Sequence, residues 1–322
     1  MSQTSKQPLY RIRNWREPNQ ALIKRGSLTI WVDRQAIDAW AYSGPSRRGA
    51  QHVYSDTAIQ CLLTLRAAFH LPLRAAQGLG QSIFGLMGLP LAVPHYSTLC
   101  RRAADLRVDL ARQGRGPLHL VLDSTGLKVY GEGQWKVRKH GVSKRRTWRK
   151  LHLAIDAQTH EVRAMSLTEA GVDDAEEADG LIKGAGRPLA RVAADGAYDK
   201  PKVYEALRGH DARILIPPQR NARIWKHGNA SGPPLPREEN LRRIRRIGRA
   251  AWKEKVGYHI RSLAEPGMGR MKGLLGSHLA NRGLGTQLAE AAIGCRAMNI
   301  MDFPTDGGRR VNGLSGSFVL GG

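Results

Sequence analysis

Two aspartates come directly after short apolar runs that predict buried strands. Asp123 follows residues 118–122, and Asp195 follows residues 191–194. Ligands of open α/β sheets bind beyond the carboxyl ends of the strands, so two parallel neighbouring strands would set these carboxylates side by side. Each would then raise the pKa of the other unless a cation neutralises the pair, and Mg²⁺ prefers such oxygen ligands. Taken singly, either aspartate could instead simply cap a helix or a turn.

A second group of residues has the spacing of one helix face. Tyr258, Arg261, Glu265 and Lys272 follow one another at intervals of three, four and seven residues. At about 100° per residue, a continuous helix places all four on one narrow stripe. These residue types suit contact with phosphate groups better than burial in a core. On geometry alone, a solvated amphipathic face is the alternative.

Three further motifs accompany this spacing, namely LHLAID (151–156), ADGAYD (194–199) and IPPQRNA (216–222). Together with the Tyr-x2-Arg-x3-Glu-x6-Lys pattern, they resemble bacterial insertion-sequence transposases with a DDE triad, in the type-four/type-five branch. The resemblance covers most of residues 118–300 and, more loosely, residues 30–110. Any one of these motifs alone would be a weak signal, whereas the combination is specific.

The resemblance implies a DNA transposase with a ribonuclease H-like catalytic core. It implies that Asp123, Asp195 and Glu265 form the catalytic triad and hold two Mg²⁺ or Mn²⁺ ions. Two such ions activate the attacking oxygen and stabilise the leaving oxygen at phosphorus. The resemblance assigns contacts with the transposon-end phosphates to three more residues, Tyr258, Arg261 and Lys272. It also implies a homodimer acting on DNA.

Pro266 and Gly267 interrupt the helical stripe directly after Glu265. A proline in a helix interior removes a backbone hydrogen bond and costs about 3 kcal/mol or more. We therefore expect the helix to kink or restart at this point, so that Lys272 is displaced from the stripe and contributes less than the other three residues.

The net charge of the chain points to a polyanionic partner. The 322 residues include 51 Lys and Arg against 27 Asp and Glu, a formal net charge of +24. Such a charge repels itself in a compact protein unless an anion binds, and nucleic acid is the leading candidate. The resemblance implies double-stranded DNA, namely the terminal inverted repeats of the element and the target DNA.

Two blocks of basic residues, at 136–150 and 237–255, are the candidate surfaces for the DNA backbone. Phosphate neutralisation by such blocks gives strong, salt-sensitive binding without base readout, although a solvated face is again the alternative. A short basic helix after residue 94 resembles the exposed face of a recognition helix. The candidate DNA-binding residues from these three segments are Arg145, Arg146, Lys150, Arg242, Arg245, Arg246, Arg101 and Arg102.

The elements that must position these residues divide the chain into three parts. Residues 1–112 are basic and mostly helical, with Gly turns typical of a helix-turn-helix DNA-binding region. Residues 116–302 alternate between strands and helices and predict an α/β domain with a mixed five-stranded sheet and flanking helices. A single basic helical segment is expected over residues 238–265. Residues 303–322 are Gly-rich and predict a flexible tail.

Several classes of protein are disfavoured by the sequence. The longest apolar run is interrupted by Pro90 and is shorter than a membrane span requires. The first 19 residues lack the apolar segment of a secretion signal, and three widely spaced cysteines predict neither a disulfide framework nor a zinc site. We therefore expect a cytoplasmic protein of the bacterial nucleoid with no membrane partner.

The sequence as a whole predicts an enzyme, a metal-dependent DNA transposase that binds the ends of an insertion sequence, cleaves DNA and joins strands. Two alternatives stay open. One is a catalytically impaired DNA-binding remnant of the same family. The other is a ribonuclease H-like nuclease that cuts DNA without joining it.

Overall fold

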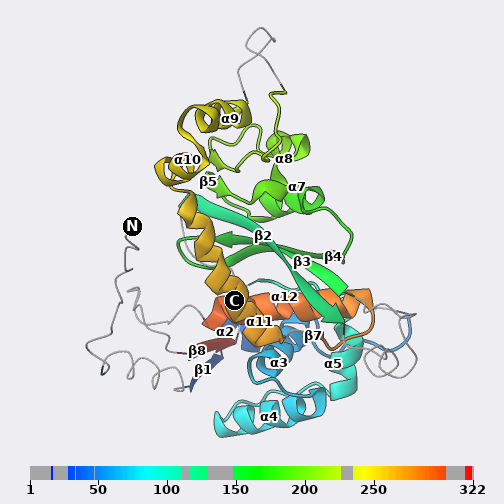
Figure 1. The fold of residues 1–322 in the computed structure, drawn as a ribbon. Helices are drawn as coiled ribbons and strands as arrows, with labels where there is room; N and C mark the ends of the chain where they lie inside the picture. Colours follow the sequence, from blue (N-terminus) through cyan, green and yellow to red (C-terminus); the bar gives the residue numbers. More distant parts are fainter. Residues whose placement is uncertain are drawn as a thin grey trace, which may run out of the picture.

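The structure of the chain is a computed structural model, and its ribbon is drawn in Figure 1. It describes residues 16, 28–32, 34–46, 48–110, 116–129, 148–225, 235–276, 278–301 and 316–320. The candidate DNA-binding residues Arg145 and Arg146 lie outside these ranges.

A mixed sheet forms the centre of the molecule. Its strands are β2 (Leu118–Val129), β3 (Trp148–Asp156), β4 (Val162–Glu169), β5 (Leu189–Ala193), β6 (Arg213–Leu215) and β7 (His278–Leu279). The order is β4-β3-β2-β5-β6, and β7 pairs with the far end of β2. The first three strands are antiparallel, whereas β5 and β6 run parallel to β2. The expected ribonuclease H-like fold, a mixed sheet with flanking helices, is thereby confirmed, with β7 as a sixth strand.

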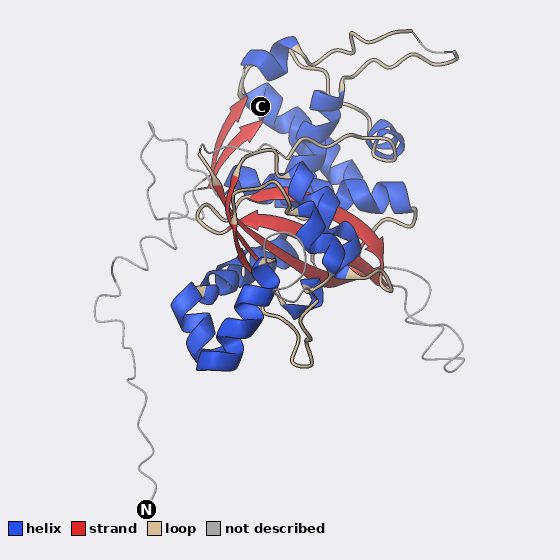
Figure 2. Cartoon of the chain, turned by 90° about the horizontal axis from the view of Figure 1, so that it is seen from above, coloured by secondary structure: helices blue, strands red, loops and turns tan. Residues whose placement is uncertain are grey.

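Alternation along the strands divides the core between the two faces of the sheet. On β2, Val121 and Leu127 contribute to one hydrophobic cluster, and Leu120 and Leu122 to another. The first face is covered by α10 (Arg249–Val256), α11 (Ala264–Leu275) and α12 (Leu284–Met301), and the second by α7 (Asp174–Gly184) and α8 (Pro201–Ala206). Helices accordingly lie on both sides of the strands (Figure 2).

The basic segment expected as one helix is divided into three, so that prediction was wrong. The segment forms α9 (Pro236–Ile247), α10 and the 3₁₀ helix η2 (Tyr258–Leu263). Gly248 and Gly257 separate them with φ angles of 82° and 71°. A right-handed helix cannot continue through a positive φ, and glycine adopts it without a steric penalty.

The N-terminal region contains four described helices, α2 (Arg34–Asp38), α3 (Asp56–Ala68), α4 (Leu73–Leu86) and α5 (Tyr96–Arg102). The sequence offers Ser55 or Asp56 as the cap of α3, and Ser55 takes this role by accepting a hydrogen bond from the backbone N–H of Ala58 at 3.2 Å. These helices do not enclose a core by themselves. Ile293 and Ile300 of α12 complete it.

Helix α12 is therefore shared between two cores. Its Cys295 and Met298 pack under the sheet, while Ile293 and Ile300 face α3. Asn299, which is fully buried on the same helix, bonds both backbone groups of Val162 at 2.8 and 2.9 Å. In Figure 1 this helix runs between the sheet and the N-terminal helices.

The Gly-rich end of the chain is not a flexible tail throughout, contrary to expectation. Residues Gly316–Leu320 form β8, which pairs in parallel with β1 (Leu28–Val32). Strands β1 and β8 thus form a small sheet separate from the central one.

Candidate active site

Asp123 and Asp195 occupy equivalent positions on two parallel neighbouring strands. The register pairs Val121 of β2 with Ala193 of β5, and each aspartate is two residues further along its own chain. Side chains alternate with a period of two, so both aspartates share the face of Val121 and Ala193, which α11 covers. Neighbouring strands lie about 4.8 Å apart. The pairing of β2 with β5 ends here, which opens the sheet beside the two carboxylates.

Asp123 does not close its strand, contrary to expectation. β2 continues to Val129. Asp123 pairs with Leu153 of β3, and the pairing of β2 with β3 extends beyond Asp123. Asp195 does follow the end of β5. Its Oδ1 accepts a hydrogen bond from the backbone N–H of Ala197 at 2.9 Å and caps a 3₁₀ turn, so its capping role and its place beside Asp123 coexist.

Arg261 joins the other two members of the expected triad. Its Nη2 lies 3.5 Å from Asp123 Oδ2, and its Nη1 lies 3.8 Å from Glu265 Oε1. One guanidinium group therefore contacts the carboxylates of both Asp123 and Glu265. Within the described ranges, no three acidic, histidine or cysteine side chains surround one point at metal-ligand spacing.

Burial dominates the electrostatics of Asp123. It raises the pKa of this carboxyl above its ordinary value, against the opposing effects of Arg261 and of the Ser124 N–H, which donates to Asp123 Oδ1 at 3.0 Å. The negative charges of Asp195 and Asp174 add to the rise. A positive charge placed between these carboxylates would relieve the repulsion.

Tyr258 fixes the start of η2 against the end of β5. Its hydroxyl donates a hydrogen bond to the carbonyl oxygen of Ala194 at 3.1 Å, next to Asp195. A 3₁₀ helix has three residues per turn, so Tyr258 and Arg261 share one side of η2. The continuous α-helical stripe expected from the sequence is therefore wrong in its first half, although these two side chains still lie together.

Glu265 and Lys272 share one face of α11, seven residues apart, and both are exposed. Pro266 does not interrupt this helix. It lies in the first turn of α11, which begins at Ala264, and backbone N–H groups there have no partner within a helix. The expected displacement of Lys272 relative to Glu265 is thus not found.

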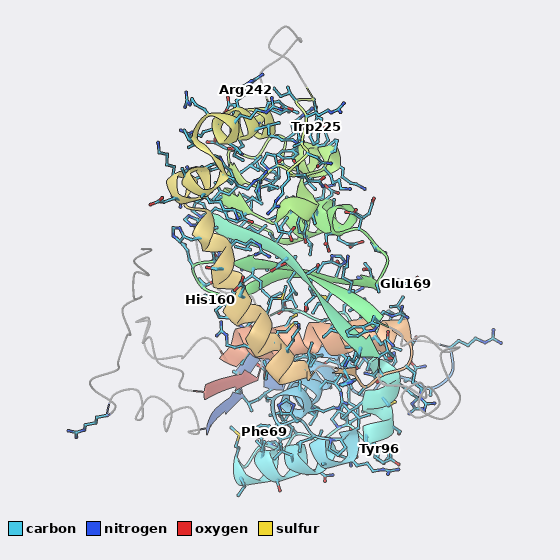
Figure 3. All side chains as sticks on the ribbon, viewed as in Figure 1. Phe69, Tyr96, His160, Glu169, Trp225 and Arg242 are labelled. Carbon is cyan, nitrogen blue, oxygen red and sulfur yellow. The ribbon has the colours of Figure 1, made fainter. Side chains whose placement is uncertain are left out.

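The remaining candidate DNA-binding residues differ in their solvent exposure and in the internal contacts that they make. On α9, Arg242, Arg245 and Arg246 are exposed, while Leu241 is buried. Figure 3 shows Arg242 at the end of the molecule opposite the N-terminal helices. Arg101 is also exposed, on α5.

Two candidates instead serve internal contacts. Arg102 donates to Asp56 Oδ1 at 2.5 Å and to the carbonyl of Tyr54 at 2.7 Å, which ties α5 to the start of α3. Lys150 donates to the carbonyl of Val172 at 2.8 Å and lies 3.3 Å from Asp174 Oδ1. Neither interaction was visible in the sequence, because each joins residues far apart along the chain.

A buried ion pair that sequence reasoning missed holds α9 in place. Arg237 at the start of α9 donates from Nε to Asp199 Oδ1 at 2.6 Å and from Nη2 to Oδ2 at 3.2 Å. Asp199 also accepts from the Gln219 N–H at 2.9 Å, and the guanidinium lies 3.5 Å from the ring centre of Trp225. The last residue of the ADGAYD motif thereby connects the end of β5 to the basic helix.

A mixed sheet that sets two aspartates side by side, with a third acid on the adjoining helix, defines the ribonuclease H-like class. The chain also matches two family models, each described as a transposase DDE domain, over residues 23–132 and 114–301. The second match spans more than half of the chain, so the chain belongs to the DDE transposase domain family.

Solved structures with some similarity to this chain include two transposase complexes. One is a cryo-EM structure of the piggyBac transposase synaptic complex with hairpin DNA, at 14% identity and a TM-score of 0.40, covering 87% of this chain and 73% of that one. The other is the Drosophila P element transposase strand transfer complex, at 10% identity and a TM-score of 0.30, covering 77% and 80%. Among the described helices, none is both long and apolar enough to cross a bilayer.

Proposed function

We propose that the protein is the transposase of a bacterial insertion sequence of the type-four/type-five branch. It binds the terminal inverted repeats of its element and catalyses divalent-metal-dependent DNA cleavage and strand transfer. The observation that carries this proposal is the alignment of Asp123 with Asp195 across two parallel strands, with Arg261 linking Asp123 to Glu265. Membership of the DDE transposase domain family supports it.

The chemistry of the three carboxylates, though not yet their spacing, suits a divalent metal. Their oxygens are the hard ligands that Mg²⁺ and Mn²⁺ prefer. Burial raises the pKa of Asp123, and the ionised carboxylate is stabilised by an adjacent cation, the role that Arg261 now has. Bound by Asp123, Asp195 and Glu265, two metal ions would supply Lewis-acid activation of the attacking oxygen and charge stabilisation of the leaving oxygen.

The remaining residues of the site hold the DNA strand. The planar guanidinium of Arg261 can pair with two oxygens of one phosphate, which Lys272 would engage as a point charge further along the same helix. Tyr258 supports this grip by keeping η2 against the end of β5. To donate to a phosphate as well, its hydroxyl would have to release the carbonyl of Ala194.

The exposed arginines of α9 are the proposed contact with double-stranded DNA beyond the cleavage site. Arg242, Arg245 and Arg246 share a solvent-facing side of the helix, and Asp199 fixes the start of that helix beside the catalytic strand end. Such contacts bind the backbone without reading sequence. Arg101 on α5 lies among the N-terminal helices and is the candidate for a separate DNA contact. We further propose that two copies act together on the two ends.

The test is a cleavage assay on linear DNA carrying the terminal repeats and flanks of the element, with Mg²⁺ or Mn²⁺. The wild type should cut at the repeat end, and Asp123→Asn, Asp195→Asn and Glu265→Gln should each lose several orders of magnitude in rate. Asp179→Asn, an exposed acid of α7 paired with Lys183, is the matched control and should cleave normally.

A second arm supplies pre-cut ends and a target plasmid. Joined products that depend on the same three acids support the transposase. Cutting without joining would assign a nuclease instead, and DNA binding without cutting would assign an inactive remnant. Either result contradicts the proposal.

A further inference from the structure

A tight turn in the IPPQRNA motif, just beyond the end of β6, lies against the turn that begins at Asp195. The backbone N–H of Gln219 donates to Asp199 Oδ2 at 2.9 Å. The side-chain Nε2 of Gln219 lies 3.5 Å from the carbonyl oxygen of Gly196, the residue after Asp195. In the sheet, β6 neighbours β5 on the side away from β2. The turn therefore borders Asp195 on the side away from Asp123, at the edge of the sheet where ligands of α/β proteins bind.

Arg249, the first residue of α10, reaches the same turn. Its Nη2 donates to the carbonyl oxygen of Gln219 at 3.4 Å, which is long for a hydrogen bond. The arginine is half-buried, and no acidic side chain in the described part of the chain pairs with it. By contrast, Arg237 and Arg261 at this end of the sheet each pair with an aspartate. A guanidinium partly removed from water without an acidic partner is stabilised when an anion binds to it.

Arg249 and Arg261 approach the end of β5 from two sides. Arg261 contacts Asp123 on β2, whereas Arg249 contacts the turn that follows β6. Since β5 lies between β2 and β6, Asp195 at its end lies between the two guanidinium groups. The surroundings of Tyr258, whose hydroxyl bonds the carbonyl beside Asp195, agree with this placement. Burial raises the pKa of that hydroxyl, and the positive charges of Arg261 and Arg249 both oppose the rise.

Arg220 adds an exposed cation to the same turn. The backbone N–H of Ala222 donates to the carbonyl oxygen of Gln219 at 3.1 Å, so Arg220 is a central residue of a tight turn. The bond from Gln219 to the buried Asp199 fixes this turn to the end of β5. Both cations are thus carried by backbone that is already in place before DNA binds.

Resting on the proposed function, we propose that Arg249 and Arg220 bind a DNA backbone phosphate on the β6 side of the bond to be cut. With Arg261 on the β2 side, the strand is then held on both sides of Asp195. Holding a reacting group in one orientation lowers the barrier to reaction. To bind a phosphate with its planar fork, Arg249 releases only a long bond to a carbonyl, whereas Arg261 releases two carboxylates.

The test uses end DNA in which the phosphates flanking the cut are replaced, one at a time, by neutral methylphosphonates. On unmodified ends, Arg249→Gln should lower kcat/KM for cleavage about tenfold or more, as expected for a lost charged hydrogen bond. The Tm of the free protein should be unchanged. At one flanking position, the methylphosphonate should slow the wild type by a similar factor and slow Arg249→Gln no further, because both changes remove the same contact. Arg220→Gln should show the same coupling with a smaller loss.

Arg213→Gln is the matched control. Arg213 is exposed at the start of β6, at the other end of the strand from the turn, so this variant should cut normally and remain sensitive to every methylphosphonate. Losses that multiply at every position in Arg249→Gln, or a lower Tm that accounts for its lost activity, would overturn the role of Arg249 while leaving the proposed function in place. A wild type that cuts no end DNA would overturn the proposed function and this inference with it.

Discussion

The guanidinium of Arg261 lies 3.5 Å from the carboxylate of Asp123, which ties the segment before α11 to the middle of β2. The same group reaches Glu265 at 3.8 Å. The helix that carries Glu265 is thus held against the strand that carries Asp123 by one guanidinium group.

Asp123→Asn should stabilise the protein at neutral pH. The pKa of Asp123 is raised in the folded state, mainly by burial, so the ionised carboxylate favours unfolding and stability falls as the pH rises through the folded-state pKa. The neutral asparagine removes this effect. Urea unfolding should give a gain at pH 7 that shrinks as the pH is lowered toward about 4, the ordinary range of the carboxyl.

The exposed Glu265→Gln is the control for this measurement and should change stability by less than about 0.5 kcal/mol at either pH. A loss of stability in Asp123→Asn at pH 7 would mean that the ion pair with Arg261 outweighs the cost of burial, contrary to our expectation.

Replacing Arg242, Arg245 and Arg246 together with alanine should weaken DNA binding and its dependence on salt. Each phosphate contact contributes a slope of about 0.9 in a plot of log K against log salt, so three lost contacts lower the slope by between about two and three. Binding to duplex DNA at several salt concentrations measures it. The double variant Lys183→Ala/Arg208→Ala, whose charges are paired with Asp179 and Glu205, should leave the slope unchanged.

Asp199→Asn should destabilise the protein by up to about 3–5 kcal/mol, because it removes the carboxylate that binds the buried guanidinium of Arg237 through two nitrogens and leaves Glu238 Oε1, at 3.7 Å, as its ionic partner. Urea unfolding provides the measurement. Asp179→Asn, which breaks an exposed ion pair on α7, should cost less than about 1 kcal/mol. Similar losses in the two variants would argue that the pair with Arg237 is no more important than a surface contact.

Gly267→Ala should stabilise α11, whereas Pro266→Ala should have little effect. A Cβ at position 267 would meet only Ile155 Cδ1 at 3.5 Å, an ordinary contact, and alanine is favoured over glycine in a helix by about 1 kcal/mol. Pro266 lies in the first turn, where no helical hydrogen bond is lost. Thermal midpoints of both variants test this, and a larger gain from Pro266→Ala would restore the view that proline strains the helix.

The sequence predicted the parts of the fold that depend on neighbouring residues. Ser55, one of the two candidate caps, caps α3. The apolar runs before Asp123 and Asp195 form strands at the expected places. The condition set for the two aspartates, two parallel neighbouring strands, is met by β2 and β5, whereas the role of the two carboxylates stays a prediction.

The parts that were not predicted depend on distant contacts or on backbone angles that composition leaves open. A glycine such as Gly248 can lie inside a helix or end one, and the sequence does not distinguish these cases. The positive φ of Gly248 shows that it ends the helix. β2 extends beyond Asp123 because β3 supplies hydrogen-bond partners more than twenty residues away. The acidic partners of Arg102 and Lys150 are likewise distant in the sequence. The neighbouring residues therefore did not show that these two side chains form internal ion pairs rather than contacts with DNA.

The burial of α12 between two cores has a consequence for how the chain is synthesised. The ribosome releases α3 long before α12, so the N-terminal helices must wait with their apolar side uncovered until residues 284–301 emerge. A product that stops short of α12 would lack Ile293 and Ile300 from the core of its N-terminal helices and is expected to be degraded.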